Sequence, residues 1–416
     1  MVIWPVVAGL LWMGSSRAED SCSPVRLDRG SGVMAKIPAT DQGSHGICYA
    51  VAASQFFDAY RAKKDPAGFK PSSPHFSAIS KILAANGESA PESVDGYQDY
   101  RALMNIYEYG ACQRDAYGEK KMEASEKIVA RLMGLKRSYD TSLLWKDLRF
   151  EQQEYHGLEW IEPHYREIER QVRFNLDQAK RDYANGPACT RKELQTLGAD
   201  KKQLETILLQ YQKDDIRGFA DAVGGLECPA KYRIPVENEP RMEIAEPDRG
   251  DLLRQRDHWK DFLESSRRGE RKLSKEDLAF VQDLIQRQTR FLEEHRNSGD
   301  FEFRKAWMRD RIERSLKKDG LPLMVSYCAT VAISWLRRQL LEDDCGGHVS
   351  VLIGRRRGPG GRCQLLIRNS WGKDPPWTYR KEVTPEGDNY WIDEDRFYQS
   401  PLIRVTAYSD APRASR

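Results

Sequence analysis

The pattern of apolar and polar residues divides the 416-residue chain into three regions. In the first, residues 19–117, it predicts a helix over Cys48–Lys63 and another over Tyr97–Tyr109, which ends at Gly110, a residue type common just after helix C-termini. In the second, residues 118–302, long charged runs carry apolar residues three and four positions apart. This is the spacing of amphipathic helices, so the second region is predicted to be α-helical.

Two segments of the second region show the helical spacing clearly, His164–Ala184 and Glu276–His295. Ser274, followed three residues later by Asp277, resembles the capping arrangement that begins a helix. Between the two segments, Gly224–Gly250 contains four prolines and is predicted to be a long irregular connection.

The third region, residues 303–408, begins with a helix that ends at Gly320 and then changes to the pattern of strands. Four strands are predicted: Leu321–Tyr327, His348–Gly354, Gln364–Arg368 and Tyr390–Ile392. The segment Arg355–Gly361 contains three glycines and predicts the turn between the second and third of them. Residues 409–416 are predicted to form a frayed tail.

Composition narrows the class of protein. Apolar residues make up 40%, or about 47% when the 30 glycines are included, which is ordinary for a globular chain. The aromatic content of 10% excludes a fully disordered one. The formal net charge is only +3, and no polybasic tail is present. The sequence therefore indicates neither a dedicated nucleic-acid binder nor a membrane-surface binder.

The first residues have the pattern of an export signal. Val2–Met13 is uncharged and apolar, and small residues follow, with Ser16 and Ala18 at the positions that precede a cleavage site. Residues 1–18 are therefore predicted to be a signal peptide, which makes the mature protein secreted or periplasmic. The alternative, an uncleaved anchor, is disfavoured because the run is too short to span a bilayer core of about 30 Å. No other stretch is long and apolar enough to span.

An exported chain can use its eight cysteines in disulfides. If one of them serves as a thiol, at most three bridges form and one cysteine is left over. Connectivity cannot be read from sequence alone, but two groups favour internal pairing: Cys328, Cys345 and Cys363, and the pair Cys189 and Cys228.

Cys48 stands where reactive thiols are found. The glycine-containing loop Asp41–Ile47 precedes it, and the predicted helix begins at Cys48 itself. The partial positive charge at a helix N-terminus stabilises a thiolate. Gln42 lies across the loop, so its amide N–H and the backbone N–H of Cys48 can together form an oxyanion hole.

Two further motifs lie on neighbouring predicted strands. His348 begins one strand, and Asn369 ends the next in the sequence Asn-Ser-Trp-Gly. If the two strands pair around their hairpin, both side chains lie at the same end. Asn369 can then orient the imidazole, and Trp371 can shield that hydrogen bond from water.

Taken in order, these motifs resemble the papain-like cysteine peptidases. Gln42…Gly46-x-Cys48, a histidine heading a strand and Asn-Ser-Trp-Gly are the main features. Three lesser ones agree with them: Asp95-Gly96-Tyr97, Gly320–Val325 and Tyr390-Trp391-Ile392. The resemblance covers about half of the chain.

The resemblance implies an α+β fold of two lobes, with a helical lobe over 19–117, an antiparallel β-rich lobe over 303–408 and an α-helical insertion over 118–302. It implies a hydrolase that needs no cofactor and no metal and acts on protein or peptide substrates. Its candidate catalytic residues are Cys48 as nucleophile, His348 as its ion-pair partner and acid, Asn369 as the orienter of His348, and Gln42 in the oxyanion hole. Its candidate substrate-binding residues are Gly96, Tyr97, Val325, Val349 and Trp371.

The chain departs from the family pattern in two ways that matter. His45 replaces a loop cysteine and is expected to pack in its loop rather than touch substrate. From Cys48 to His348 the chain runs 300 residues, against about 130–150 expected, and the excess is the helical insertion. The insertion is a candidate lid, self-inhibitor or partner-docking module, or a bystander on the surface.

Other readings of the sequence stay open. The chain can be an inactive papain-like binding module, or an acyl-transfer or deamidase relative that uses the same thiolate. The spacing of His156 and His164 fits no zinc motif.

Overall fold

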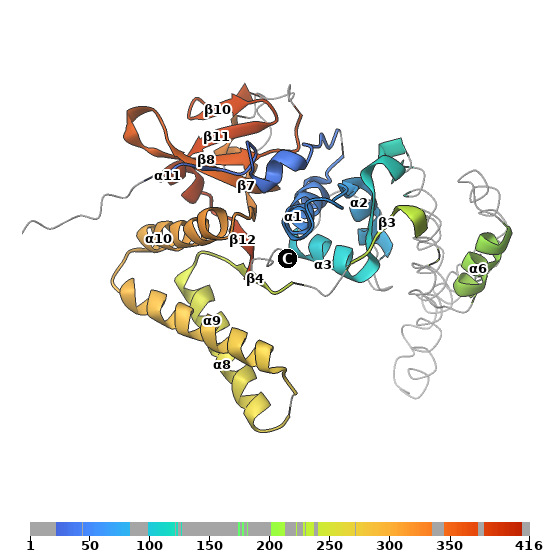
Figure 1. Cartoon of the computed structure of the whole chain (residues 1–416), viewed down its shortest axis with the longest axis horizontal. Helices are drawn as coiled ribbons and strands as arrows, with labels where there is room; N and C mark the ends of the chain where they lie inside the picture. The colour runs from blue at the N-terminus through green and yellow to red at the C-terminus, as the bar shows by residue number, and fades with distance from the viewer. Residues whose placement is uncertain are drawn as a thin grey trace, which may run out of the picture.

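The computed structural model describes residues 22–43, 45–83, 99–120, 122–123, 126, 201–212, 230–236, 240–270, 272–334, 345–372 and 378–409, with isolated residues 174, 177–178, 181, 222 and 228. They form a mixed α+β structure in which an antiparallel sheet packs against helices (Figure 1). The predicted signal peptide, Gly96, Tyr97, most of the helix over His164–Ala184 and nearly all of the tail lie outside the described residues.

Helices α1 (Cys48–Lys64), α2 (Pro74–Leu83) and α3 (Asp99–Tyr109) pack together as one layer. Helix α1 is buried along most of its length, and it lies between the other two helices and the sheet (Figure 1). Gly110 follows α3 with φ +84°, a backbone angle that glycine adopts without steric cost, so the predicted end of this helix is confirmed.

The main sheet joins eight of the described strands in purely antiparallel pairs, as the predicted α+β class requires. Its order is β10 (Val383–Glu386), β11 (Asn389–Asp393), β8 (Cys363–Arg368), β7 (Gly347–Arg357), β5 (Leu323–Cys328), β12 (Ile403–Tyr408) and β4 (Met242–Ala245), and β1 (Val25–Arg26) pairs with the far end of β7. Strands β5, β7, β8 and β11 match the four predicted strands within a few residues at each end.

Smaller elements complete the described chain: β2 (Ala111–Cys112) pairs with β3 (Arg233–Ile234), and β6 (Ile333–Ser334) pairs with β9 (Thr378–Tyr379). Short helices are α6 (Lys201–Gln212) and α11 (Glu394–Tyr398). Helix α10 (Asp300–Ile312) continues as a π-helical stretch over Glu313–Lys318.

The second region supplies a helical hairpin that projects from the body of the molecule, α8 (Arg249–Arg267) and α9 (Lys275–Glu294) (Figure 1). The predicted start of α9 is confirmed, because the Ser274 side chain accepts a hydrogen bond from the backbone N–H of Asp277.

The prediction that Gly224–Gly250 is irregular is wrong, since this segment contains β3 and β4. Strand β4 extends the main sheet at β12, so the second region is not purely helical. Its inward-facing residues are Glu243 and Ala245, and Glu243 forms a buried ion pair with Arg311 of α10. Because the buried residue Glu243 is charged, β4 lacks the alternation of apolar and polar residues by which a strand is recognised in a sequence.

Three disulfides join the described cysteines: Cys22–Cys363, Cys112–Cys228 and Cys328–Cys345. The expected bridge within the C-terminal group is confirmed by Cys328–Cys345. The expected bridge between Cys189 and Cys228 is wrong, because Cys228 bonds to Cys112 across 116 residues of sequence. Pairing of β2 with β3 brings these two cysteines together, and the sequence does not show that pairing.

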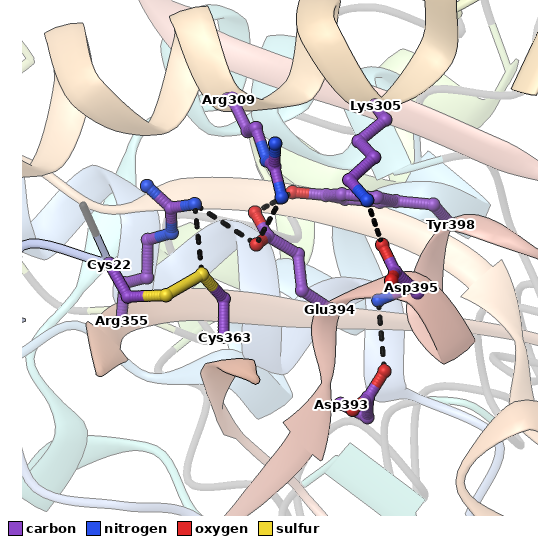
Figure 2. Close-up of a disulfide and its surroundings, with 9 residues drawn as sticks. All are labelled: Cys22, Lys305, Arg309, Arg355, Cys363, Asp393, Glu394, Asp395 and Tyr398. Atoms are coloured by element: carbon purple, nitrogen blue, oxygen red, sulfur yellow. Dashed lines mark hydrogen bonds and ion pairs between the residues drawn. A yellow bond between two sulfur atoms is a disulfide. The ribbon is translucent and has the colours of Figure 1, made fainter. Parts of the chain in front are cut away.

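The Cys22–Cys363 bridge fastens the first described residues to the start of β8, beside a buried charge cluster (Figure 2). Glu394 is 1% exposed; it accepts hydrogen bonds from Arg355 at 3.0 Å and from the Tyr398 hydroxyl at 2.5 Å. Arg355 also donates to the Cys363 sulfur at 3.5 Å. A buried carboxylate with these donors is well compensated, so the cluster ties α11 to the sheet.

None of the described helices is long and apolar enough to cross a membrane.

Candidate active site

His348 occupies the second residue of β7, where it is 4% exposed. Its register partner across the sheet is Tyr327 of β5, and the two rings meet edge to face with centroids 5.5 Å apart. Directly paired residues of an antiparallel ladder share one face of the sheet. The imidazole is therefore held by regular sheet geometry rather than by a loop.

The structure brings His348 and Asn369 together. The Nε2 atom of His348 lies 3.1 Å from Oδ1 of Asn369, so the imidazole N–H donates to the amide oxygen. The Asn369 amide nitrogen in turn donates to the Tyr379 hydroxyl at 3.4 Å. Trp371 stacks on the imidazole, with ring centroids 4.2 Å apart and planes 29° apart. This arrangement fixes the tautomer, since Nε2 carries the proton and Nδ1 is left as the basic nitrogen.

Burial lowers the pKa of His348 to about 4, and the hydrogen bond to Asn369 opposes this shift only in part. The imidazole is therefore neutral at pH 7 unless a negative charge stands beside it. A neutral imidazole can accept a proton, which suits a general base.

Cys48 is the first residue of α1 and is half-buried. Among the described cysteines it is the one outside the three disulfides, so it keeps its thiol. Helix α1 packs against β5 and β7. Burial raises the pKa of Tyr327, and the charge of the nearby Cys48 raises it further. Cys48 thus lies within electrostatic range of the residue that pairs with His348.

Gln42 connects the loop before α1 to the end of β8. Its Oε1 accepts a hydrogen bond from the Ser370 hydroxyl at 2.5 Å, and its backbone N–H donates to the Ser370 carbonyl oxygen at 2.8 Å. Its side-chain Nε2 donates to the His45 carbonyl oxygen at 2.8 Å. A carboxamide nitrogen has two protons, so one remains for an oxyanion.

The register of β5 and β7 separates two of the expected substrate-binding residues. Val325 pairs with Ser350, whereas Val349 pairs with Ser326, so Val325 and Val349 face opposite sides of the sheet. Ser326 shares a face with Val349 and is 9% exposed, while the other residues of β5 are fully buried. Val325 shares its face with Tyr327 and therefore with His348, so Val349 is the expected substrate-binding residue that the register places on the side away from the imidazole.

Gly372, directly after Trp371, is the last residue of the Asn-Ser-Trp-Gly motif and has a structural role of its own. Its φ is +72°, and a side chain there would collide with the Asp41 carboxylate. A glycine is required because the Asp41–Gln42 loop lies directly against this turn. The Asn-Ser-Trp-Gly motif could have indicated this requirement.

No family model matches the sequence, and no curated protein matches it. The case for a function therefore depends on the geometry of these side chains.

Proposed function

We propose that this chain is a papain-like cysteine peptidase that hydrolyses peptide bonds through the Cys48 thiol. The observation that carries the proposal is the hydrogen bond from Ser370 to Gln42, residues 328 apart in sequence. It joins the loop that leads to Cys48 to the residues directly after β8, where Asn369 is hydrogen-bonded to His348. This contact supports a shared site for the Cys48 thiol and the His348 imidazole, although 300 residues separate them in sequence.

Each residue has a role in the proposed reaction. The Cys48 sulfur attacks the peptide carbonyl carbon while His348 takes the thiol proton. The carbonyl oxygen becomes an oxyanion, which accepts hydrogen bonds from Gln42 and from the backbone N–H of Cys48. His348 then gives its proton to the leaving amine as the C–N bond breaks. Water, deprotonated by His348, hydrolyses the thioester and restores the thiol.

Because the pKa of His348 is low, the Cys48 thiol and the His348 imidazole are both expected to be neutral at rest, unless a Cys48 thiolate stabilises the imidazolium as an ion pair. An isolated imidazolium in this buried position is disfavoured. The α1 N-terminus favours the thiolate side of the balance, because the helix dipole places partial positive charge beside Cys48.

We also propose that the protein is exported. Three disulfides are compatible with an oxidising compartment, in which such bonds form and persist.

Active-site titration tests the proposal. The full chain and its Cys48→Ala variant are treated with an epoxide thiol inhibitor and assayed with a broad set of fluorogenic peptides. We expect one inhibitor per chain and peptide turnover in the unchanged protein, and neither in the variant.

A Cys48→Ser variant is the matched control, because it keeps the side-chain size and lacks the thiolate. Turnover that survives in Cys48→Ala or Cys48→Ser would contradict the proposal. Labelling without hydrolysis, together with amide transfer to an added amine, would instead favour an acyl-transfer enzyme. Folded protein with neither labelling nor turnover would favour a binding module.

A further inference from the structure

A second cluster of polar side chains lies beside the proposed active site, on its exposed flank. It consists of His45, from the loop before α1, and of Glu119 and Glu123. The two glutamates are four residues apart in a helical segment that begins after Gly118, so they project from the same side. Met122, between them in sequence, is fully buried, and this anchors the segment against the core.

The spacing of the three side chains is compatible with a metal site, and the same distances are those of the ion pairs that His45 forms with both glutamates. The His45 Nε2 atom lies 3.5 Å from Oε1 of Glu119 and 3.3 Å from Oε1 of Glu123. All three ligand atoms lie within 4.8 Å of one another. In a tetrahedral zinc site with bonds of about 2.1 Å, neighbouring ligand atoms are about 3.4 Å apart. The two distances from the imidazole match this value.

The charge of the cluster also favours a cation. Among the described residues, the ion pairs of Glu119 and of Glu123 are both with His45. Two carboxylates then share one imidazole, so the cluster is negative whether or not the imidazole is protonated.

We propose that His45, Glu119 and Glu123 bind a Zn²⁺ ion, with water in the fourth position. Imidazole and carboxylate are ligands that zinc accepts, and three protein ligands with an open position form a recognised class of site. This inference goes beyond the peptidase proposal, because it concerns a separate set of side chains.

The ion would fasten the loop that carries Gln42. The backbone N–H of His45 donates to the Gln42 carbonyl oxygen at 3.4 Å, and the His45 carbonyl oxygen accepts from the Gln42 side chain at 2.8 Å. Fixing the His45 side chain to the helical segment therefore fixes the residue that orients Gln42. Zinc at this position stabilises the loop and takes no part in the chemistry of the thiol.

Zinc binding is measured directly, in the full chain with Cys48→Ala so that no thiolate competes for the metal. The chelator-treated protein is titrated with zinc chloride against a chromophoric chelator, and bound metal is counted by elemental analysis after gel filtration. We expect one zinc per chain. Glu119→Gln and Glu123→Gln should each weaken zinc binding by about 10–100-fold or more, because the loss of a residue that merely supports a metal ligand already has an effect of this size. His45→Asn should abolish zinc binding.

Glu126→Gln, on the same segment but outside the cluster, is the matched control and should bind zinc normally. Thermal melts verify that each variant is folded, and the two half-exposed glutamates offer substitutions that disturb no core packing. Zinc affinity that is unchanged in folded His45→Asn or Glu119→Gln would overturn the proposal, as would the absence of binding at micromolar zinc. Neither result depends on peptide hydrolysis, so this test and that of the peptidase proposal fail independently.

Discussion

The two halves of the candidate active site are held in opposite ways. His348 and Asn369 are 4% and 2% exposed, and they belong to or directly follow strands in the middle of the sheet. Gln42 and Cys48 are half-buried and belong to a loop and to the helix start that follows it. The half with His348 and Asn369 is therefore part of the protein core, whereas the half with Gln42 and Cys48 is held by polar contacts near solvent.

The contrast indicates where the site is rigid. The imidazole has aromatic rings on two sides and a buried amide partner, so its orientation does not depend on a bound substrate. The position of Gln42 depends on a few hydrogen bonds to Ser370 and His45. Substitutions in the buried half should lower both stability and activity, whereas those in the loop half should lower activity alone.

The largest effect is expected for His348→Ala. Loss of the proposed general base should reduce kcat/KM by about 10²–10⁴-fold. It should also lower the free energy of unfolding, because Asn369 loses its buried partner and a cavity opens between Tyr327 and Trp371. Peptide kinetics and urea unfolding measure the two effects. His258→Ala, at an exposed position of α8, is the control and should change neither.

Gln42→Ala should reduce kcat by about 10²–10³-fold, the usual loss on removal of one oxyanion donor. Stability should change little, by about 1 kcal/mol, because the residue lies near solvent. Gln42→Glu keeps the shape but lacks the N–H donors, so it should lose as much kcat as the alanine variant. Normal turnover by Gln42→Glu would show that this side chain is not an oxyanion donor.

The buried half should also respond to pH. The pKa of His348 is lowered from 6.5 to about 4, so the unfolded chain binds a proton there that the folded chain does not. The free energy of unfolding should therefore fall as pH drops from about 6.5 to 4, by up to about 3 kcal/mol from this group.

Urea unfolding at several pH values measures this effect, in a Cys48→Ala background that removes the thiolate. Comparison with the same chain carrying His348→Gln isolates the contribution of this one imidazole from those of the carboxylates. Identical pH dependence in the two chains would contradict the assignment of a neutral, buried imidazole.

The smallest effect is expected for Ser370→Ala, which removes one bond between the halves. Loss of its donation to Gln42 should reduce kcat about fivefold, corresponding to about 1 kcal/mol. In combination with Gln42→Ala it should have no further effect, because both changes break the same interaction. Full additivity in this double-mutant cycle would show that Ser370 acts in another way.

Much of the sheet could be predicted from the sequence. Strands β5, β7 and β8 carry dense apolar runs, and the turn after Arg357 is rich in glycine, so their position and pairing are recognisable. Because β7 and β8 pair around that turn, the meeting of His348 with Asn369 follows from the same pattern. Strand β4 could not be predicted, since one of its two buried residues is Glu243, whose partner Arg311 is 68 residues away.

Other features depend on register or on distant contacts, which a sequence does not display. The register between β5 and β7 decides whether Val325 or Ser326 lies on the same face of the sheet as Val349. A register shift of one residue would move every side chain of the strand to the opposite face. The cluster of His45 with Glu119 and Glu123 joins residues more than 70 positions apart and matches no short motif.

The Cys112–Cys228 disulfide has a covalent consequence for the whole chain. It closes residues 113–227 into a loop that lies inside the larger loop closed by Cys22–Cys363. All but the last five residues of the helical lobe, and the whole β-rich lobe, lie outside the smaller loop. A protease that cuts any peptide bond inside it produces two polypeptides that stay joined as one molecule. Such nicked protein would run as two bands on a reducing gel and as one band on a non-reducing gel, with the described sheet and the proposed active site still covalently connected.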